Sequence, residues 1–499
     1  MSLSLYNTLG KKIEPFQPLR EGSVGFYGCG PTVYNYAHIG NLRAYITHDL
    51  LVRTLRARGL TVTHVMNVTD VGHLTGDDDT GSDKMLKSAE ERGKSVLEVA
   101  DFYMKAFFND TSRLNIAQPD VICRATKHIP EMIALIKRIE ANGFTYAAGG
   151  NLYFDISKFP SYGELARLKL NDLPNGVSQM DEGVKIARTA FDGNKRNTGD
   201  FVLWFTKSKF ENQALVWDSP WGRGYPGWHI ECSAMSMKYL GEQFDIHAGG
   251  IDHIQIHHTN EIAQTESATG KHPWVRFWVH NEFLVLDKGK MSKSTGGFIT
   301  LQDIIDKGFD PLDLRYFMLG GHYRNQLQFS DDSLKGAQNS RKSLLNTLKS
   351  IADRVKSGNP NRVDEAIARS KDADALKKGA ASKYLDEFDA ALDDDLNTPR
   401  SLSSLWGLLK DLSIEPTEIL AAAFYMDAVL GIKLSESLQN KAQSPVDDSL
   451  KAEVEALLAE RAAAKKNKDF ERADAIRGIL KERGITVEDT PQGAVWKKI

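Results

Sequence analysis

Apolar and polar positions near the start of the chain alternate in blocks that are typical of an α/β fold. Residues 24–27 form a short apolar run bounded by glycine, which predicts a buried strand. A helical pattern follows over about 42–58, and a second β-prone run at 61–68 comes directly after it. This strand–helix–strand order predicts a βαβ unit and therefore a parallel sheet.

The same alternation returns later in the chain. Strands are predicted at 244–247 and 277–286, with a helical stretch between them. The residues from about 120 to 225 have a different texture, with mixed helices and segments punctuated by glycine and proline. We interpret this stretch as an insertion that splits one α/β domain.

The rest of the chain is predominantly helical. Alanine, leucine, lysine and aspartate dominate beyond about residue 331, and helices are predicted again over 451–483. A polar segment at 439–445 contains a proline and predicts a linker. We expect a Rossmann-type parallel sheet split by an insertion, then a helical bundle and a small C-terminal domain. The expected limits are 1–125 and 226–330 for the two halves of the α/β domain, 126–225 for the insertion, 331–438 for the bundle and 446–499 for the C-terminal domain.

Composition narrows the class of protein. At 499 residues the chain is too long for one compact core, and its three cysteines are too few for a disulfide framework. They indicate a reducing cytosol and thiols used for metal binding or catalysis. We expect a cytoplasmic protein without a membrane segment, because neither a signal peptide nor a long apolar span is present. The net charge of −3 means that nucleic acid, if bound, must meet local basic patches.

The first motif with chemistry is His38-Ile39-Gly40-Asn41, at the point where a predicted strand gives way to a helix. A helix N-terminus offers free N–H groups and a positive dipole end to a phosphate, and glycine lets the ligand approach the backbone. His38 could hydrogen-bond a phosphoryl oxygen as charge develops there. The same four residues also fit an ordinary turn.

The second motif is Lys290-Met291-Ser292-Lys293-Ser294, which glycines flank on both sides. Its two lysines could stabilise the negative charge of a leaving pyrophosphate. Alone, the segment also fits a solvated basic turn. Taken in this order, each beside a predicted strand, the two motifs resemble the signatures of class I aminoacyl-tRNA synthetases.

Four residues from three segments form a candidate metal site. His257 and Glu261 are four apart in a predicted helix and share one face. Cys29 lies at the end of the first strand, and Cys232 lies in a separate segment. Two thiolates, an imidazole and a carboxylate form a reasonable tetrahedral zinc set. A buried cysteine is also commonly a small apolar residue, and a His/Glu pair of this spacing is commonly a surface hydrogen bond.

Longer stretches resemble the cysteinyl-tRNA synthetase family. They are residues 29–34 (Cys-Gly-Pro-Thr-Val-Tyr), 228–235 around Cys232, 257–263 around the His/Glu pair, and 469–477 with Trp496 near the C-terminus. The similarity runs from about residue 5 to the end of the chain. The resemblance implies that Cys29, Cys232, His257 and Glu261 hold one zinc ion, which binds the thiolate of the substrate cysteine.

The resemblance also implies an adenylate site and a set of partners. His38, Gly40 and Asn41 would contact ATP, Gly250 and Asp252 its sugar, and Lys290 and Lys293 its phosphates, with magnesium accompanying the nucleotide. Thr69, Trp228 and His229 would border the bound cysteine. The family's partners are tRNA(Cys), cysteine and ATP, and we expect a monomer in which the bundle and the C-terminal domain bind the tRNA.

Several positions depart from the common pattern. Asn41 stands where the class I signature has histidine, and Thr259 lies where glutamate is more usual. Glu282 follows Asn281 in place of glycine, Gly296-Gly297 alters the loop after the second motif, and residues 71–79 form a longer stretch than usual. None of these changes removes a chemical group that the implied reaction needs.

Two other functions fit part of the pattern. A cysteine ligase that joins cysteine to a small amine, as in mycothiol synthesis, would use the same adenylating core. A non-catalytic, zinc-containing RNA-binding protein would keep the metal set and the basic C-terminal helix. Residues 461–483 contain eight Lys/Arg against four Asp/Glu, which favours tRNA binding over the small-amine ligase. Lys290 and Lys293 argue against the non-catalytic alternative.

Overall fold

The computed structural model describes residues 3–71, 88–89, 92–168, 193–207, 215–286, 289–290, 298–356, 361–439 and, with short gaps, 454–498. The chain divides into two compact units, Met1–Leu434 and Ser435–Ile499. None of the helices in the described residues is long and apolar enough to span a membrane.

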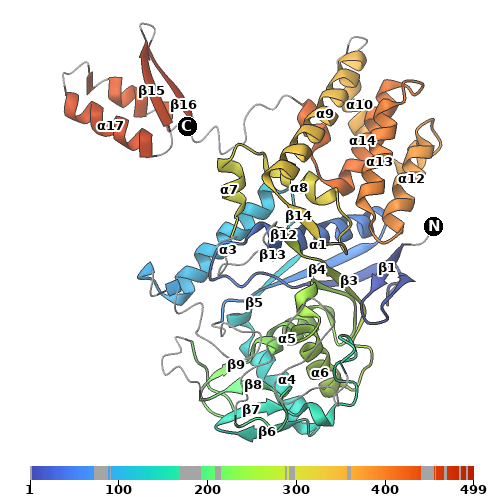
Figure 1. Ribbon diagram of the computed structural model, residues 1–499, viewed down its shortest axis with the longest axis vertical. Coiled ribbons are helices and arrows are strands. Elements are labelled where there is room, and N and C mark those ends of the chain that lie inside the picture. Colours follow the sequence, from blue (N-terminus) through green and yellow to red (C-terminus); the bar gives the residue numbers. More distant parts are fainter. Residues whose placement is uncertain are drawn as a thin grey trace. The chain divides into compact units, whose positions relative to one another are not determined.

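A five-stranded parallel sheet forms the centre of the first unit (Figure 1). Its order is β11 (Val275–Asn281), β10 (Phe244–Gly250), β3 (Ser23–Gly28), β4 (Thr61–Val68) and β5 (Val121–Arg124). The strands are buried at nearly every position, as expected for a parallel sheet covered on both faces. The prediction of a Rossmann-type α/β fold is confirmed.

Helices connect these strands. The helix α1 (Ile39–Ala57) joins β3 to β4, α3 (Val96–Arg113) precedes β5, and α6 (His257–Thr269) joins β10 to β11. From β3 the chain continues to one side of the sheet, whereas β10 and β11 lie on the other side. The order of the strands therefore reverses between β3 and β10, and ligands of such folds bind at the carboxyl ends of the strands at this point.

The inserted segment contains an antiparallel sheet of its own. Its four strands are β6 (Thr145–Ala148), β7 (Asn151–Phe154), β8 (Phe201–Phe205) and β9 (Tyr225–Pro226), and α4 (Ile129–Ala141) precedes them. The sequence texture did not indicate this sheet. All positions of β7 and β8 are buried, so these short strands lack the alternation of polar and apolar residues that marks a strand with one exposed face.

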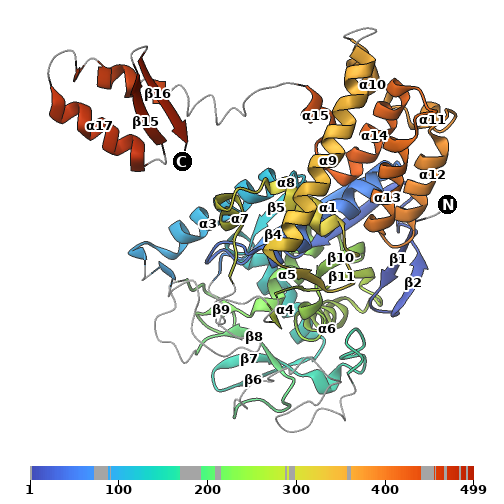
Figure 2. The same ribbon diagram turned by 45° about the horizontal axis from the view of Figure 1, so that its top comes forward.

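A helical region follows the α/β domain, as predicted. Figure 2 shows its longer helices side by side. They are α8 (Pro311–Leu319), α9 (Asp331–Lys356), α10 (Arg362–Arg369), α12 (Ser382–Asp393), α13 (Thr398–Lys410) and α14 (Pro416–Leu430), with the short α7 (Leu301–Asp306), α11 (Ala373–Leu376) and α15 (Leu434–Leu438). A small sheet of β12 (Leu284–Leu286), β13 (Gly289–Lys290) and β14 (Leu327–Phe329) lies at the start of this region.

Hairpins form near both ends of the chain. At the start, β1 (Ser4–Asn7) pairs with β2 (Lys12–Pro15). In the second unit, α17 (Phe470–Glu482) is followed by the antiparallel strands β15 (Ile485–Thr490) and β16 (Gly493–Lys498). The core of this unit contains Val454, Ile476, Leu480 and Ile485. The helix was expected and the hairpin was not, because its residues carry no clear alternation of apolar and polar side chains.

Candidate metal and adenylate site

The four candidate zinc ligands meet at the carboxyl edge of the central sheet. Cys29 directly follows β3, Cys232 lies in α5 (Trp228–Leu240), and His257 and Glu261 lie on α6. All four side chains are buried, and one ligand atom from each lies within 4.8 Å of the others. The structure thus brings together residues that are far apart in the sequence.

Two glycines allow this close approach. A Cβ on Gly30 would lie 1.7 Å from the carbonyl oxygen of Asn67, so the segment after Cys29 can pass against β4 only without a side chain. A Cβ on Gly227 would lie 2.0 Å from the carbonyl oxygen of Val202, and α5 begins at the next residue. The backbone beside Cys29 and at the start of α5 is therefore packed too tightly for any residue other than glycine at positions 30 and 227.

A second set of possible ligands overlaps the first. Cys29, His247, His258 and Glu261 also place their ligand atoms within 4.8 Å of one another. His247 Nε2 lies 2.9 Å from Glu261 Oε2, and His258 Nε2 lies 3.3 Å from Cys29 Sγ. Neither His247 nor His258 is among the residues that the sequence analysis proposed as metal ligands.

The charges at this site depend on one another. Burial would lower the pKa of His257, but Glu261 and Cys232 together raise it to about 10. Burial would raise the pKa of Glu261, but His247 and His257 lower it to about 2. The hydrogen bond with Cys29, together with burial, raises the pKa of the Cys232 thiol well above its ordinary value. Without a metal ion, an imidazolium–carboxylate pair and neutral thiols therefore coexist here.

A chain of buried hydrogen bonds runs outward from Cys29. His258 contacts Cys29 with Nε2, and its Nδ1 lies 2.7 Å from His280 Nε2. His280 Nδ1 lies 2.8 Å from the hydroxyl of Thr8. Sequence analysis missed His258, His280 and Thr8. One feature of the sequence could have pointed to His280. It lies near the carboxyl end of β11, and in a parallel sheet this end lies beside the carboxyl ends of β10 and β3.

Of the residues expected around the bound cysteine, His229 and Trp228 lie beside the ligand His257, and Thr69 contacts α5. His229 Nδ1 lies 2.9 Å from His257 Nδ1, and the ring of Trp228 lies 4.5 Å from that of His257. The hydroxyl of Thr69 donates to Glu231 Oε2 at 2.9 Å, and both groups are buried. Glu231 was not predicted, and it links the end of β4 to α5.

The first signature caps α1. His38 is the N-cap residue and its Nδ1 accepts from the backbone N–H of Asn41, while Asn41 Oδ1 accepts from the N–H of His38. Both side chains therefore stabilise the helix end that a phosphate would approach. Gly250 ends β10, and Asp252 lies in the short turn that follows.

Residues 299 and 300, which follow the second signature in the sequence, lie against the first signature. The N–H of Ile39 donates to the carbonyl oxygen of Ile299, and His38 forms a bridge with Thr300. The backbone of Lys290 pairs with Val285 in the β12–β13 hairpin. Lys293 lies outside the described residues.

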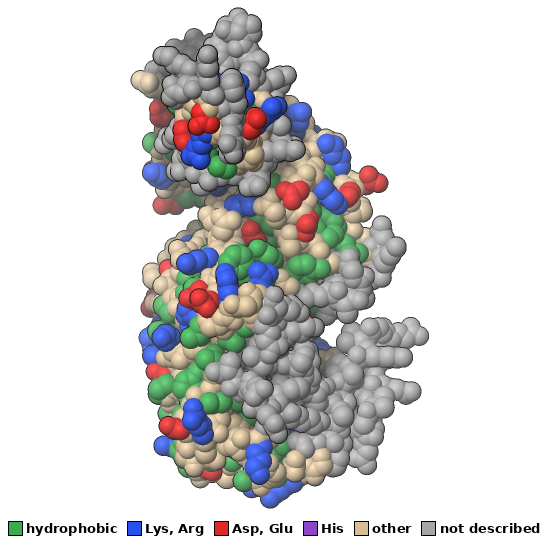
Figure 3. Space-filling view, turned by 90° about the vertical axis from the view of Figure 1, so that its left-hand side faces the viewer, with side chains coloured by type: hydrophobic (Ala, Val, Ile, Leu, Met, Phe, Trp, Pro, Cys, Tyr) green, Lys and Arg blue, Asp and Glu red, His purple; other side chains and the backbone are tan. Residues whose placement is uncertain are grey.

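The surface gives a mixed picture of charge. Figure 3 shows Lys and Arg interspersed with Asp and Glu on the side of the molecule that it presents, with hydrophobic side chains between them. Among the described residues of this face, no charge of one sign dominates. This agrees with the near balance of 63 basic and 66 acidic residues.

Comparisons with known proteins assign the family. Residues 15–339 match the model of the tRNA synthetases class I (C) catalytic domain, and residues 447–496 match that of the cysteinyl-tRNA ligase anticodon binding domain. The chain is 58% identical to the cysteine–tRNA ligase of Treponema denticola and 43% identical to that of Borreliella burgdorferi, with 100% of both chains covered in each case.

A solved structure supports the fold alone. Methionyl-tRNA synthetase of Mycobacterium tuberculosis, in complex with methionyl-adenylate, matches with a TM-score of 0.56 and 16% identity. The match covers 86% of this chain and 96% of that one. With two family models and full-length relatives in agreement, the chain belongs to the cysteinyl-tRNA synthetase family of class I enzymes.

Proposed function

We propose that this protein is a cysteine–tRNA ligase, which activates cysteine with ATP and transfers it to tRNA(Cys). The observation that carries the proposal is the convergence of two thiols, an imidazole and a carboxylate within 4.8 Å at the carboxyl edge of the sheet, where the segment after β3 leads to the first signature at the start of α1. Family membership supplies the reaction, and this site supplies a reason why the amino acid is cysteine.

The residues at the site suit a zinc ion. Glu261 Oε1 is buried and makes no hydrogen bond within the described part of the chain, although His257 Nε2 lies 3.0 Å from it. A metal ligand would be in this state before the ion binds. Of the two overlapping sets, we choose Cys29, Cys232, His257 and Glu261, because its two sulfurs suit zinc better than one. His247 and His258 then hydrogen-bond the ligands Glu261 and Cys29 and orient them.

The zinc ion would supply selectivity. An apolar pocket discriminates weakly between serine and cysteine, which differ by one atom, whereas zinc binds a thiolate far better than a hydroxyl group. Thr69, Trp228 and His229 surround the place where the amino acid would lie. Such a site needs no second domain that hydrolyses wrong products.

Adenylate formation needs no nucleophile from the protein. The carboxylate of cysteine attacks the α-phosphorus of ATP, pyrophosphate leaves, and the enzyme orients the reactants and stabilises charge. His38, Gly40 and Asn41 at the start of α1 would contact the nucleotide, Gly250 and Asp252 its sugar, and Lys290 and Lys293 the leaving pyrophosphate. Magnesium would accompany the phosphates.

The remaining parts of the chain would bind the tRNA. We assign the two halves of the catalytic domain to 1–125 and 226–330, the insertion to 126–225, the bundle to 331–438 and the anticodon-recognition domain to 446–499. The match of residues 447–496 to an anticodon binding domain favours this function over a ligase for a small amine. We further propose a cytoplasmic monomer.

Pyrophosphate exchange tests the proposal. Purified protein should exchange labelled pyrophosphate into ATP only when cysteine is added, and it should then charge total tRNA with cysteine. Exchange without charging would favour the small-amine ligase. Absence of both activities in zinc-replete protein would favour the non-catalytic RNA-binding protein and reject the proposal.

A further inference from the structure

Arg43, on the second turn of α1, is almost fully buried and binds only backbone oxygens of two distant segments. Its exposed fraction is 2%. Nη1 donates to the carbonyl oxygens of Glu282 and Phe283 at 2.9 and 2.6 Å. Nη2 donates to those of His322 and Asn325 at 3.2 and 2.6 Å, with Tyr323 at 3.5 Å. One side chain thus holds the 282–283 and 322–325 segments against α1.

These contacts lie beside both signatures. Arg43 is two residues beyond Asn41, so it moves with the helix end that carries the first signature. Phe283 leads directly into β12, and β12 turns into β13, where Lys290 starts the second signature. The parallel partner of β12 is β14, which begins just after the 322–325 loop. Arg43 therefore connects α1, which begins at the first signature, to the segments that flank β12 and β14, and β12 pairs with the strand in which the second signature starts.

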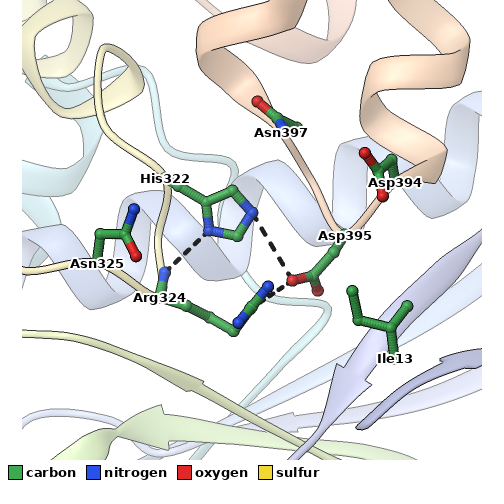
Figure 4. A pocket seen from close by; sticks show the side chains of 7 residues that line it. All are labelled: Ile13, His322, Arg324, Asn325, Asp394, Asp395 and Asn397. Carbon is green, nitrogen blue, oxygen red and sulfur yellow. Dashed lines mark hydrogen bonds and ion pairs between the residues drawn. The ribbon is translucent and has the colours of Figure 1, made fainter.

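Asp395 holds the same loop from the helical bundle. Its carboxylate accepts from Arg324 Nε at 2.5 Å (Figure 4), from the hydroxyl of Tyr323 at 2.6 Å and from the backbone N–H of Tyr6 at 2.8 Å. Asp395 is 1% exposed and connects α12 to α13 with a positive φ of 56°. This backbone conformation is rare for a residue other than glycine, and the hydrogen bonds of the carboxylate hold it.

The outer side of the loop borders a cavity. The cavity has a volume of about 380 Å³ and is lined by Ile13, His322, Arg324, Asn325, Asp394, Asp395 and Asn397. Figure 4 shows polar side chains of the loop and of the bundle facing one another across it. On this side the loop is held by polar contacts, and those of Arg43 and Asp395 add to the backbone hydrogen bond from the N–H of Glu282 to the carbonyl oxygen of Tyr323.

We propose that Arg43 is a positioning residue for the adenylation reaction, and that Asp395 acts with it from the other side of the 322–325 loop. Together they set the spacing of the two signatures and couple it to the placement of the helical bundle. The inference rests on the proposed function. Lysine cannot replace Arg43, because one ammonium group lacks the planar fork of donors that reaches two segments at once.

The test compares Arg43→Lys with a matched control, Arg315→Lys. Arg315 is fully buried, donates to the carbonyl oxygens of Leu114, Asn115 and Leu430, and pairs with Asp49 at 2.6 Å. It contacts neither signature and neither of the 282–283 and 322–325 segments, and its partner Asp49 lies on α1 six residues beyond Arg43. Both variants lose a buried guanidinium group. A difference between them in nucleotide binding or in kcat therefore reflects the contacts that Arg43 makes near the signatures.

Three quantities are measured for each variant: the Kd of a non-hydrolysable ATP analogue, the Kd of cysteine, and kcat for pyrophosphate exchange. We expect Arg43→Lys to weaken binding of the analogue by about fivefold and to lower kcat by about tenfold, with the Kd of cysteine unchanged within about twofold. Arg315→Lys should lower the melting temperature and leave all three quantities close to those of the parent.

Asp395→Asn provides an independent variant, because it keeps the size of the side chain while it removes the charge and one of the two acceptor oxygens. We expect this variant to bind the ATP analogue about threefold more weakly than the parent. In the double variant with Arg43→Lys, the factor by which the affinity for the analogue falls should be smaller than the product of the two single factors. If Arg43→Lys does not fold, the test rests on Asp395→Asn alone. The proposal is then rejected if Asp395→Asn binds the analogue as tightly as the parent does.

The outcomes separate this inference from the proposed function. If the parent shows no cysteine-dependent exchange, the proposed function fails, and the analogue affinities of the variants still test Arg43. The inference is overturned if Arg43→Lys binds the analogue no more weakly than Arg315→Lys, or if it loses cysteine affinity to the same extent.

Discussion

His257 Nε2 lies 3.0 Å from Glu261 Oε1, one helical turn away on α6, and both side chains are buried. The pair links the site's charge balance to metal binding. A zinc ion that takes both residues as ligands would bind His257 as the neutral imidazole, so metal binding would release the proton of the imidazolium and would strengthen as the pH rises. The two cysteines reinforce this dependence, because zinc binds thiolates and burial keeps the thiols neutral.

Cys232→Ser should remove the metal and cysteine activation together. We expect zinc content to fall from about one ion per chain to a small fraction, and cysteine-dependent exchange to fall by at least about a hundredfold. Elemental analysis and the exchange assay measure the two effects. Cys123→Ser is the matched control, because Cys123 is equally buried, contacts the carbonyl oxygen of Met66 and lies outside the ligand set. Full activity in a metal-free sample would contradict the assignment.

Serine should be excluded at activation and not by later hydrolysis. Size alone would give a discrimination of only about 10- to 200-fold, whereas a site that tests ligand identity should exceed about 10⁴-fold. Exchange driven by serine should therefore be close to background, and Ser-tRNA(Cys) prepared separately should remain intact when mixed with the protein. Rapid deacylation would show that an editing site exists.

Lys293→Ala should slow adenylate formation much more than it weakens cysteine binding. A charge that acts mainly on the leaving pyrophosphate contributes in the transition state, and one such contact is worth about 3 kcal/mol, or about a hundredfold in rate. Rapid-quench measurement of adenylate formation beside equilibrium binding of cysteine separates the two effects. Lys271→Ala, at an exposed lysine paired with Glu242, serves as the control. Adenylate formation at the parental rate would mean that the segment is a structural turn.

Acid should destabilise the first unit through buried neutral histidines. Burial lowers the pKa of His48 to about 3 and that of His64 to about 4. In the unfolded chain both return to about 6.5, so the unfolded state binds more protons as the pH falls. The free energy of unfolding is therefore unaffected by these two histidines above about pH 6.5. Between there and pH 4 it falls by up to about 1.4 kcal/mol per pH unit for each histidine.

His48→Leu tests this source of acid sensitivity. Neither ring nitrogen of His48 has a hydrogen-bond partner among the described residues, so leucine removes the titration without leaving a partner unsatisfied. Melting temperatures recorded from pH 7 to pH 4.5 should fall less steeply in the variant than in the parent. Parallel curves would place the sensitivity elsewhere.

Periodicity was sufficient for the elements whose burial follows a regular pattern. The βαβ unit of β3, α1 and β4, the strand β10 and the helical region were predicted, whereas the single strand expected at 277–286 is divided into β11 and β12, which belong to different sheets. The strands β7 and β8 of the insertion were missed, because they are buried along their whole length and no regular alternation of strands and helices surrounds them in the sequence. The hairpin β15–β16 was missed because its pairing, and not a local pattern, defines it.

Only those residues of the candidate site that residue type or the family resemblance indicates could be predicted from the sequence. Cys29, Cys232, His257 and Glu261 were proposed as a group, and the structure places them together. His258, His280 and Glu231 could not be found this way, because their contacts depend on where the carboxyl ends of parallel strands and the start of α5 meet. The same limit applies to Arg43, which binds main-chain oxygens that no sequence pattern marks.

The placement of the ligands on β3, α5 and α6 has a consequence for how the protein matures. Cys29 leaves the ribosome early, whereas Glu261 is synthesised only after the whole insertion has been made. A nascent N-terminal half therefore holds only one of the four proposed ligands, Cys29, which is too few for stable capture of a metal ion. Metal acquisition must follow the completion and collapse of both halves, so scarcity of the ion would leave finished but inactive molecules and would not slow their synthesis.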